Sequence, residues 1–195
     1  IELQDYPAAL RCYEKAARLT TSDPLPLEKI AQLYERQGNL DRAAIASLRA
    51  ADLYLNARDI QKAIHNWERV IRLNPANLQA RSRLAIVYER TGEKQQAIKE
   101  YLAVASILQA RGELDKALKA VNQALSLDPQ SDEARQTLGL LKDFKTLPKP
   151  SRLPGGTAPL RMAQVRQYSH NEQADDKKET DQHPVEAACQ AALTT

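Results

Sequence analysis

The chain has 195 residues, of which 43% are hydrophobic, 27% are charged and only 5% are aromatic. Most of its apolar residues are alanine and leucine, which favours closely packed helices over a β-sandwich. The net charge of +3 is too small to indicate a nucleic-acid partner. No run of 18 apolar residues is present that would span a membrane.

The only two cysteines, Cys12 and Cys189, lie far apart in the sequence, so we expect no disulfide framework. This usage favours a reducing compartment and a cytoplasmic location. A signal peptide removed upstream of Ile1 stays an open alternative.

The sequence repeats itself at a shift of 54 residues (78 − 24) when residues 24–77 are laid over residues 78–131. The same register continues backwards from residue 24 and forwards from residue 131. A fixed period of this kind is typical of a stacked solenoid. The identical pairs include Ala31/Ala85, Tyr34/Tyr88, Glu35/Glu89, Arg36/Arg90, Gly38/Gly92, Ala43/Ala97, Lys62/Lys116, Ala63/Ala117 and Pro75/Pro129.

Each repeat is predicted to form three helices, which in the second copy run over 78–91, 94–111 and 114–127. Gly92 follows the first helix and Gly112 follows the second, because glycine takes the left-handed position after a helix at no steric cost. The third helix ends before Pro129, which cannot continue it.

The third helix of the first copy, "IQKAIHNWERVIRL", places its apolar residues on one face and so puts Trp67 in the core. The middle helices are apolar almost all round, so they must be packed on most sides. We expect the repeated alanines to face neighbouring helices: Ala43, Ala63, Ala97 and Ala117.

The pattern Leu/Ile-Ala-x-x-Tyr, then Gly, Ala and Pro, resembles the tetratricopeptide repeat. It occurs as Ile30-Ala31, Tyr34, Gly38, Ala43 and, after the next helix, Pro75, and again as Leu84-Ala85, Tyr88, Gly92, Ala97 and Pro129. The resemblance covers about residues 1–145 and implies an all-α, right-handed α-solenoid of helical hairpins.

The chain departs from the family period of 34 residues. Successive signature alanines at 43, 63, 97 and 117 alternate between steps of 20 (63 − 43) and 34 (97 − 63). The middle helix is therefore predicted to serve as the second helix of one hairpin and the first helix of the next.

The resemblance implies that first helices line a concave groove that receives a partner peptide or helix. The expected contacts are Gln32, Arg36, Arg83, Ile86 and Arg90. The alternative is that these arginines, together with Arg81 and Lys29, lie on a solvated helix face with i,i+4 pairing. The family's carboxylate clamp, a lysine followed four residues later by an asparagine, is missing, so recognition of a C-terminal carboxylate is not expected.

Nothing in the sequence indicates catalysis, a cofactor or a metal. His65 is a lone helical histidine, and His170, His183 and Cys189 lack ligand-like spacing. The glycines of "LPGGT" follow no strand and precede no Lys-Ser/Thr pair, so they predict no phosphate site.

The character of the sequence changes after Phe144. We expect a repeat domain over 1–145, a Pro/Gly-rich tether and polar disordered linker over 146–183, and the start of an amphipathic helix over 184–195.

These observations favour a scaffold that binds another protein, peptide or helix and carries no chemistry of its own. A sensor or regulatory domain of a larger multidomain chain is the alternative. Pairing of two copies through exposed ends of the stack is a further option, whereas nucleic-acid and membrane partners are not expected.

Overall fold

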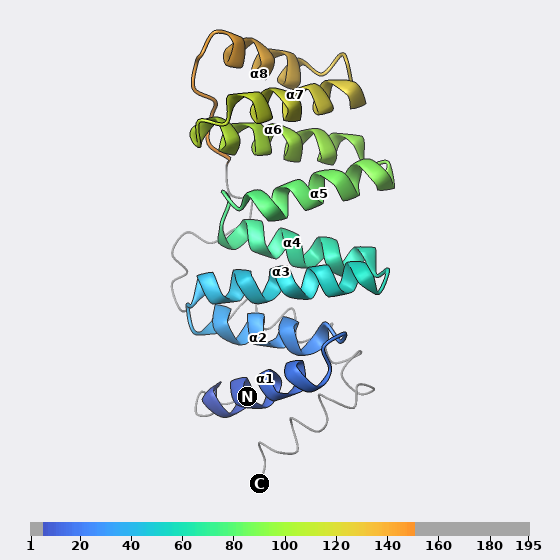
Figure 1. The fold of residues 1–195 in the computed structure, drawn as a ribbon, viewed down its shortest axis with the longest axis vertical. Coiled ribbons are helices and arrows are strands. Elements are labelled where there is room, and N and C mark those ends of the chain that lie inside the picture. The colour runs from blue at the N-terminus through green and yellow to red at the C-terminus, as the bar shows by residue number, and fades with distance from the viewer. Residues whose placement is uncertain (1–5, 151–195) are drawn as a thin grey trace. The chain divides into compact units, whose positions relative to one another are not determined.

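The computed structural model describes residues 6–150, and within this range the chain forms eight α-helices and no β-strand (Figure 1). This confirms the predicted all-α solenoid class. The predicted linker beyond residue 150, the helix from Pro184, and the residues His170, His183 and Cys189 lie outside the described range. The helices are α1 (Tyr6–Leu19), α2 (Leu25–Arg36), α3 (Leu40–Asn56), α4 (Ile60–Leu73), α5 (Leu78–Thr91), α6 (Lys94–Ala110), α7 (Leu114–Leu127) and α8 (Asp132–Lys142).

The helices follow the register of the sequence repeat. Helices α1, α4 and α7 begin at residues 6, 60 and 114, which are steps of 54 (60 − 6 and 114 − 60). In the second copy, the predicted bounds agree with α5, α6 and α7 to within one residue. The described part of the chain divides into two compact units, residues 6–59 with α1–α3 and residues 60–150 with α4–α8.

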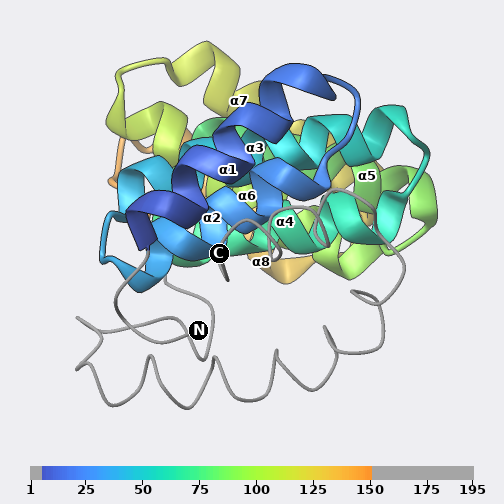
Figure 2. The same ribbon diagram turned by 90° about the horizontal axis from the view of Figure 1, so that it is seen from below.

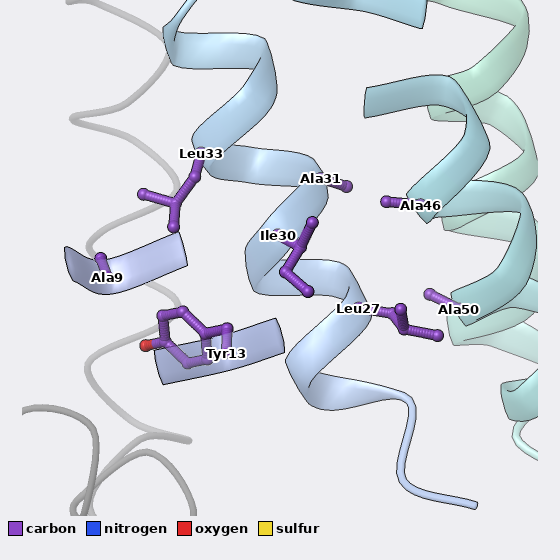
Figure 3. Packing of buried hydrophobic residues seen from close by; sticks show 8 residues of the cluster. All are labelled: Ala9, Tyr13, Leu27, Ile30, Ala31, Leu33, Ala46 and Ala50. Atoms are coloured by element: carbon purple, nitrogen blue, oxygen red, sulfur yellow. The ribbon is translucent and has the colours of Figure 1, made fainter. Parts of the chain in front are cut away.

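In the first unit α1 packs beside α2, and α2 packs beside α3 (Figure 1, Figure 2). Figure 3 shows how α2 presents different side chains to its two neighbours. Ala31 points toward Ala46 of α3, while Leu33 points toward Ala9 of α1. Small residues at these contacts let the helix backbones approach closely, which explains the alanine-rich composition.

In the second unit α6 contacts α5, α7 and α8. Its buried residues include Ile98 and Leu108, which belong to two different apolar clusters. Helix α6 is thus packed on most sides, as its sequence predicts. All four repeated alanines are fully buried: Ala43, Ala63, Ala97 and Ala117.

The turns after α3 and α6 have the same backbone geometry but different residues at the left-handed position. After α6, Gly112 has φ 78°, and its N–H donates to Gln109 O at 2.9 Å. After α3, Arg58 has φ 63°, and its N–H donates to Leu55 O at 3.0 Å. In each turn the N–H of the following residue donates to a carbonyl five residues earlier: Asp59 to Tyr54 O, and Glu113 to Leu108 O. This pair of hydrogen bonds is the Schellman arrangement. Arg58 therefore holds a conformation that favours glycine.

We expect Arg58→Gly to raise the free energy of unfolding by about 0.5–1 kcal/mol. The left-handed backbone costs a side chain roughly 1–2 kcal/mol, and the extra freedom of glycine in the unfolded chain offsets part of that gain. Urea denaturation measures the change. The reciprocal control is Gly112→Arg, because a Cβ there would meet no atom within 4 Å and only the backbone penalty remains. Equal stability of all three proteins would contradict the prediction.

Candidate partner-binding surfaces

Helix α5 presents three of the predicted contact residues on one exposed face. Arg83, Ile86 and Arg90 are spaced by three and four residues, so they follow one side of the helix. Both arginines are exposed, and Ile86 is 43% exposed, a fraction that only Leu19 and Ile45 exceed among the large aliphatic residues of the described range. The face is therefore cationic with an apolar centre.

The other two predicted contacts, Gln32 and Arg36, lie one turn apart on α2 in the first unit. They hold the repeat positions that Ile86 and Arg90 hold on α5, but both are only half-exposed. The five predicted contact residues therefore form two separate sets, one on α2 in the first unit and one on α5 in the second unit.

The repeated tyrosines link neighbouring helices. Tyr34 on α2 donates to Glu14 Oε1 on α1 at 3.5 Å, and Tyr88 on α5 donates to Glu68 Oε1 on α4 at 2.8 Å. Burial, reinforced by the Glu68 acceptor, raises the pKa of Tyr88 far above its ordinary value, so the phenol keeps its proton. These links were not predicted, although Glu14 and Glu68 are themselves identical in the repeat register.

The repeated Glu-Arg pair occurs in the second unit as Glu89-Arg90, near the end of α5, and its two residues differ in role. Glu89 accepts hydrogen bonds from Tyr101 on α6 and from Gln123 Nε2 on α7, the latter at 2.9 Å. It therefore ties three helices together. Arg90, its neighbour in sequence, is exposed and belongs to the α5 face.

Arg81 does not lie on a solvated face, which corrects that part of the sequence interpretation. Its side chain is 5% exposed and forms an ion pair with Glu100 on α6, with Nη1 2.8 Å from Oε2. Its Nε also donates to Pro75 O at 2.6 Å. Burial raises the pKa of Glu100, even though the attraction of Arg81 opposes that shift. Arg81 is thus a buried link between α5 and α6 and does not belong to the exposed face of α5.

A pocket of about 470 Å³ lies in the second unit and was not predicted from the sequence. Helix α6 contributes Leu102 and Ser106 to its wall, α8 contributes Thr137 and Leu140, and residues 147–150 close one side. One side of the pocket is formed by residues 147–150, which return to α6 after α8. Helical periodicity in the sequence does not predict where a non-helical segment packs, so the pocket could not be predicted.

The described residues hold no cluster of three or more histidine, cysteine or acidic side chains able to bind a metal. Within the same range, no helix is both long enough and apolar enough to cross a membrane.

Comparisons with known proteins agree with the repeat architecture. A family profile described as "Tetratricopeptide repeat" matches residues 1–53 and 48–107, and a second profile with the same description matches residues 98–141. Together the two matches of the first profile span more than half of the chain.

One curated relative is "BBSome complex member BBS4 homolog" of Drosophila melanogaster. It is 29% identical over 108 residues, a match that covers 48% of this chain and 22% of the relative. This chain therefore spans about a fifth of the length of that relative. Among solved structures, "Crystal structure of MamA" is 19% identical, with a TM-score of 0.31 and coverage of 91% of this chain and 92% of that chain. A TM-score this low supports no further argument.

The profile matches follow the helices along the chain: the first ends within α3, the second runs from α3 into α6, and the third runs from α6 into α8. Repeat register, helix bounds and profile matches are thus in agreement along the described part of the chain. The chain belongs to the tetratricopeptide repeat family.

Proposed function

We propose that this chain is a protein-interaction scaffold that binds a partner through the exposed face of α5. The observation that carries the proposal is the exposure of Arg83, Ile86 and Arg90, while their neighbours Leu84, Ala85 and Val87 are buried. Two guanidinium groups on either side of an aliphatic side chain suit a partner segment that carries carboxylates around an apolar residue.

The family and the curated relative support this role. Tetratricopeptide repeats are helical scaffolds rather than catalytic folds, although a fold alone does not assign a function. The Drosophila relative is named as a member of the BBSome complex. By analogy, we propose that Gln32 and Arg36 on α2 add contacts to the same partner or to a second one.

A regulatory domain within a larger chain is the second candidate. It is favoured by the length of the relative, because the matched repeats make up only 22% of that protein. In this case the α5 face would bind another segment of the same polypeptide.

The test is charge reversal on α5. We expect Arg83→Glu combined with Arg90→Glu to reduce partner capture in a pull-down by at least about tenfold, because each exposed charge now repels an acidic partner. The melting temperature should stay close to that of the unchanged chain, since exposed substitutions usually alter stability by less than about 0.5 kcal/mol.

The matched control is Arg49→Glu combined with Lys119→Glu, which changes the net charge equally at exposed positions on α3 and α7. Capture lost equally in both double variants would show a general charge effect, and unfolding of the α5 variant would show that its arginines are structural. Either outcome would overturn the proposal.

A further inference from the structure

The chain reverses direction immediately after α8. Phe144 has φ 55°, a left-handed conformation, and its side chain is 82% exposed. The N–H groups of Phe144 and Lys145 donate to Leu141 O at 3.2 Å and to Leu140 O at 2.8 Å, which completes a Schellman turn. The turn sends the segment 145–150, here called the strap, back onto α6. A tether was predicted from residue 146, and its first residues lie against α6.

The strap is held through its backbone by two side chains of α6. Gln109 Nε2 donates to Lys145 O at 2.7 Å, and Gln109 Oε1 accepts from the Leu147 N–H at 2.7 Å. Ser106 Oγ donates to Pro148 O, also at 2.7 Å. The side-chain amide of Gln109 thus bonds to the carbonyl of one strap residue and to the N–H of the residue two positions later. A neighbouring β-strand would offer the same pair of hydrogen bonds. Such contacts depend on an extended backbone and not on the identity of most side chains.

Leu147 is the apolar anchor of the strap. Its side chain is only 8% exposed and joins the cluster that contains Leu108 and Leu141. In contrast, Thr146, Pro148 and Lys149 are exposed. A single buried anchor flanked by backbone hydrogen bonds is the arrangement by which domains bind short extended peptides.

Space for a longer ligand is present beside the strap. The pocket of about 470 Å³ continues from residues 147–150 along α6 and α8, where Leu102, Ala103 and Thr137 line it. The strap itself therefore forms one wall of the pocket and leaves the remainder open.

We propose that α6 and α8 form a binding site for extended peptides with a leucine followed by proline, and that the strap is an occupant in cis which such a partner displaces. The inference rests on the proposed scaffold function and adds a second site with a defined ligand class. Proline suits this site because Pro148 is bound through its carbonyl alone, and its lack of an N–H costs no hydrogen bond there. The covalent link gives the strap a high effective concentration, so a free peptide binds the unchanged chain weakly.

The probe is a fluorescent peptide with the sequence of residues 144–150, FKTLPKP. We expect it to bind the full chain carrying Leu147→Asp at least about tenfold more tightly than the unchanged chain, because the variant strap no longer competes. When Gln109→Leu is added to the Leu147→Asp chain, we expect that chain to bind the peptide at least about tenfold more weakly than it does with Gln109 present. Gln96→Leu, at an exposed position on the same helix, is the matched control and should change nothing. A peptide with aspartate in place of its leucine should not bind.

Three outcomes would overturn the inference. Equal or undetectable peptide binding by both chains would show that the strap is a permanent brace, as would failure of the Leu147→Asp chain to fold. Binding that survives Gln109→Leu would place the peptide elsewhere. Arg83 and Arg90 do not line this pocket. If the strap inference fails but partner capture still depends on these two arginines, the proposed scaffold function still holds.

Discussion

Replacing Trp67 by alanine should lower the free energy of unfolding by about 3–5 kcal/mol, the usual cost of removing a large aromatic side chain from a core. Trp67 lies on α4, is 0% exposed and is the largest fully buried side chain in the described part of the chain. Its removal leaves a cavity that the surrounding helices fill only in part. Urea denaturation followed by circular dichroism measures the change.

Trp67→Phe is the informative companion variant. The indole Nε1 of Trp67 has no hydrogen-bond partner among the described residues, and a buried donor without a partner costs roughly 1–3 kcal/mol. Phenylalanine removes that donor while it keeps most of the apolar surface. We therefore expect Trp67→Phe to cost much less than Trp67→Ala. A loss below about 1 kcal/mol for the alanine variant would contradict the core position.

The helices could be predicted from the sequence because two independent signals coincide. Alanines recur in a fixed register, and left-handed residues or prolines end the helices at the same repeat positions. Gly38 and Gly92 show this directly, with φ values of 76° and 83°. Trp67 was predicted to lie in the core for a similar reason, since it falls on the single apolar stripe of α4. Where a non-glycine residue takes the left-handed position, as at Arg58 and Phe144, the sequence gives no such indication.

The surfaces were predictable only in part. The α5 face was found from family resemblance, and the structure places Arg83, Ile86 and Arg90 on one exposed side. Arg81 was misread because α6 is apolar almost all round, so periodicity does not identify Glu100 as the buried acid that pairs with it. The strap was missed because Leu147 is a single apolar residue within a proline-rich segment. Both contacts join residues distant in sequence, which local patterns do not report.

The Arg81–Glu100 ion pair should have the second large effect on stability. We expect Arg81→Ala or Glu100→Ala alone to lower the free energy of unfolding by about 3–5 kcal/mol, because each change leaves one buried charge without its partner. The side chains of Arg81 and Glu100 are only 5% and 10% exposed, so water screens the remaining charge poorly. As a control, Lys116→Ala removes the exposed pair with Glu113 and should leave stability almost unchanged.

Replacing both partners by apolar residues should be far less damaging. Burial raises the pKa of Glu100 against the opposing attraction of Arg81, so the cost of removing this carboxylate from water offsets part of the attraction within the pair. Arg81→Met combined with Glu100→Leu removes both charges and keeps similar volumes, so we expect most of the loss in either single variant to be recovered. If the double variant lost as much stability as the two single variants together, the ion pair would not be the coupled unit that the structure shows.

The pH dependence separates these variants further. A glutamate whose folded pKa lies above its unfolded value contributes stability below the unfolded pKa, near 4.3, and loses that contribution as the pH rises through the folded pKa. Arg81→Ala removes the attraction that opposes the raised pKa of Glu100. Its free energy of unfolding should therefore fall more steeply than that of the unchanged chain as the pH rises from about 4 toward neutrality. The double variant lacks the titrating group and should show no such additional slope. Parallel pH profiles for Arg81→Ala and the double variant, measured by urea denaturation, would mean that Glu100 is solvated once Arg81 is gone.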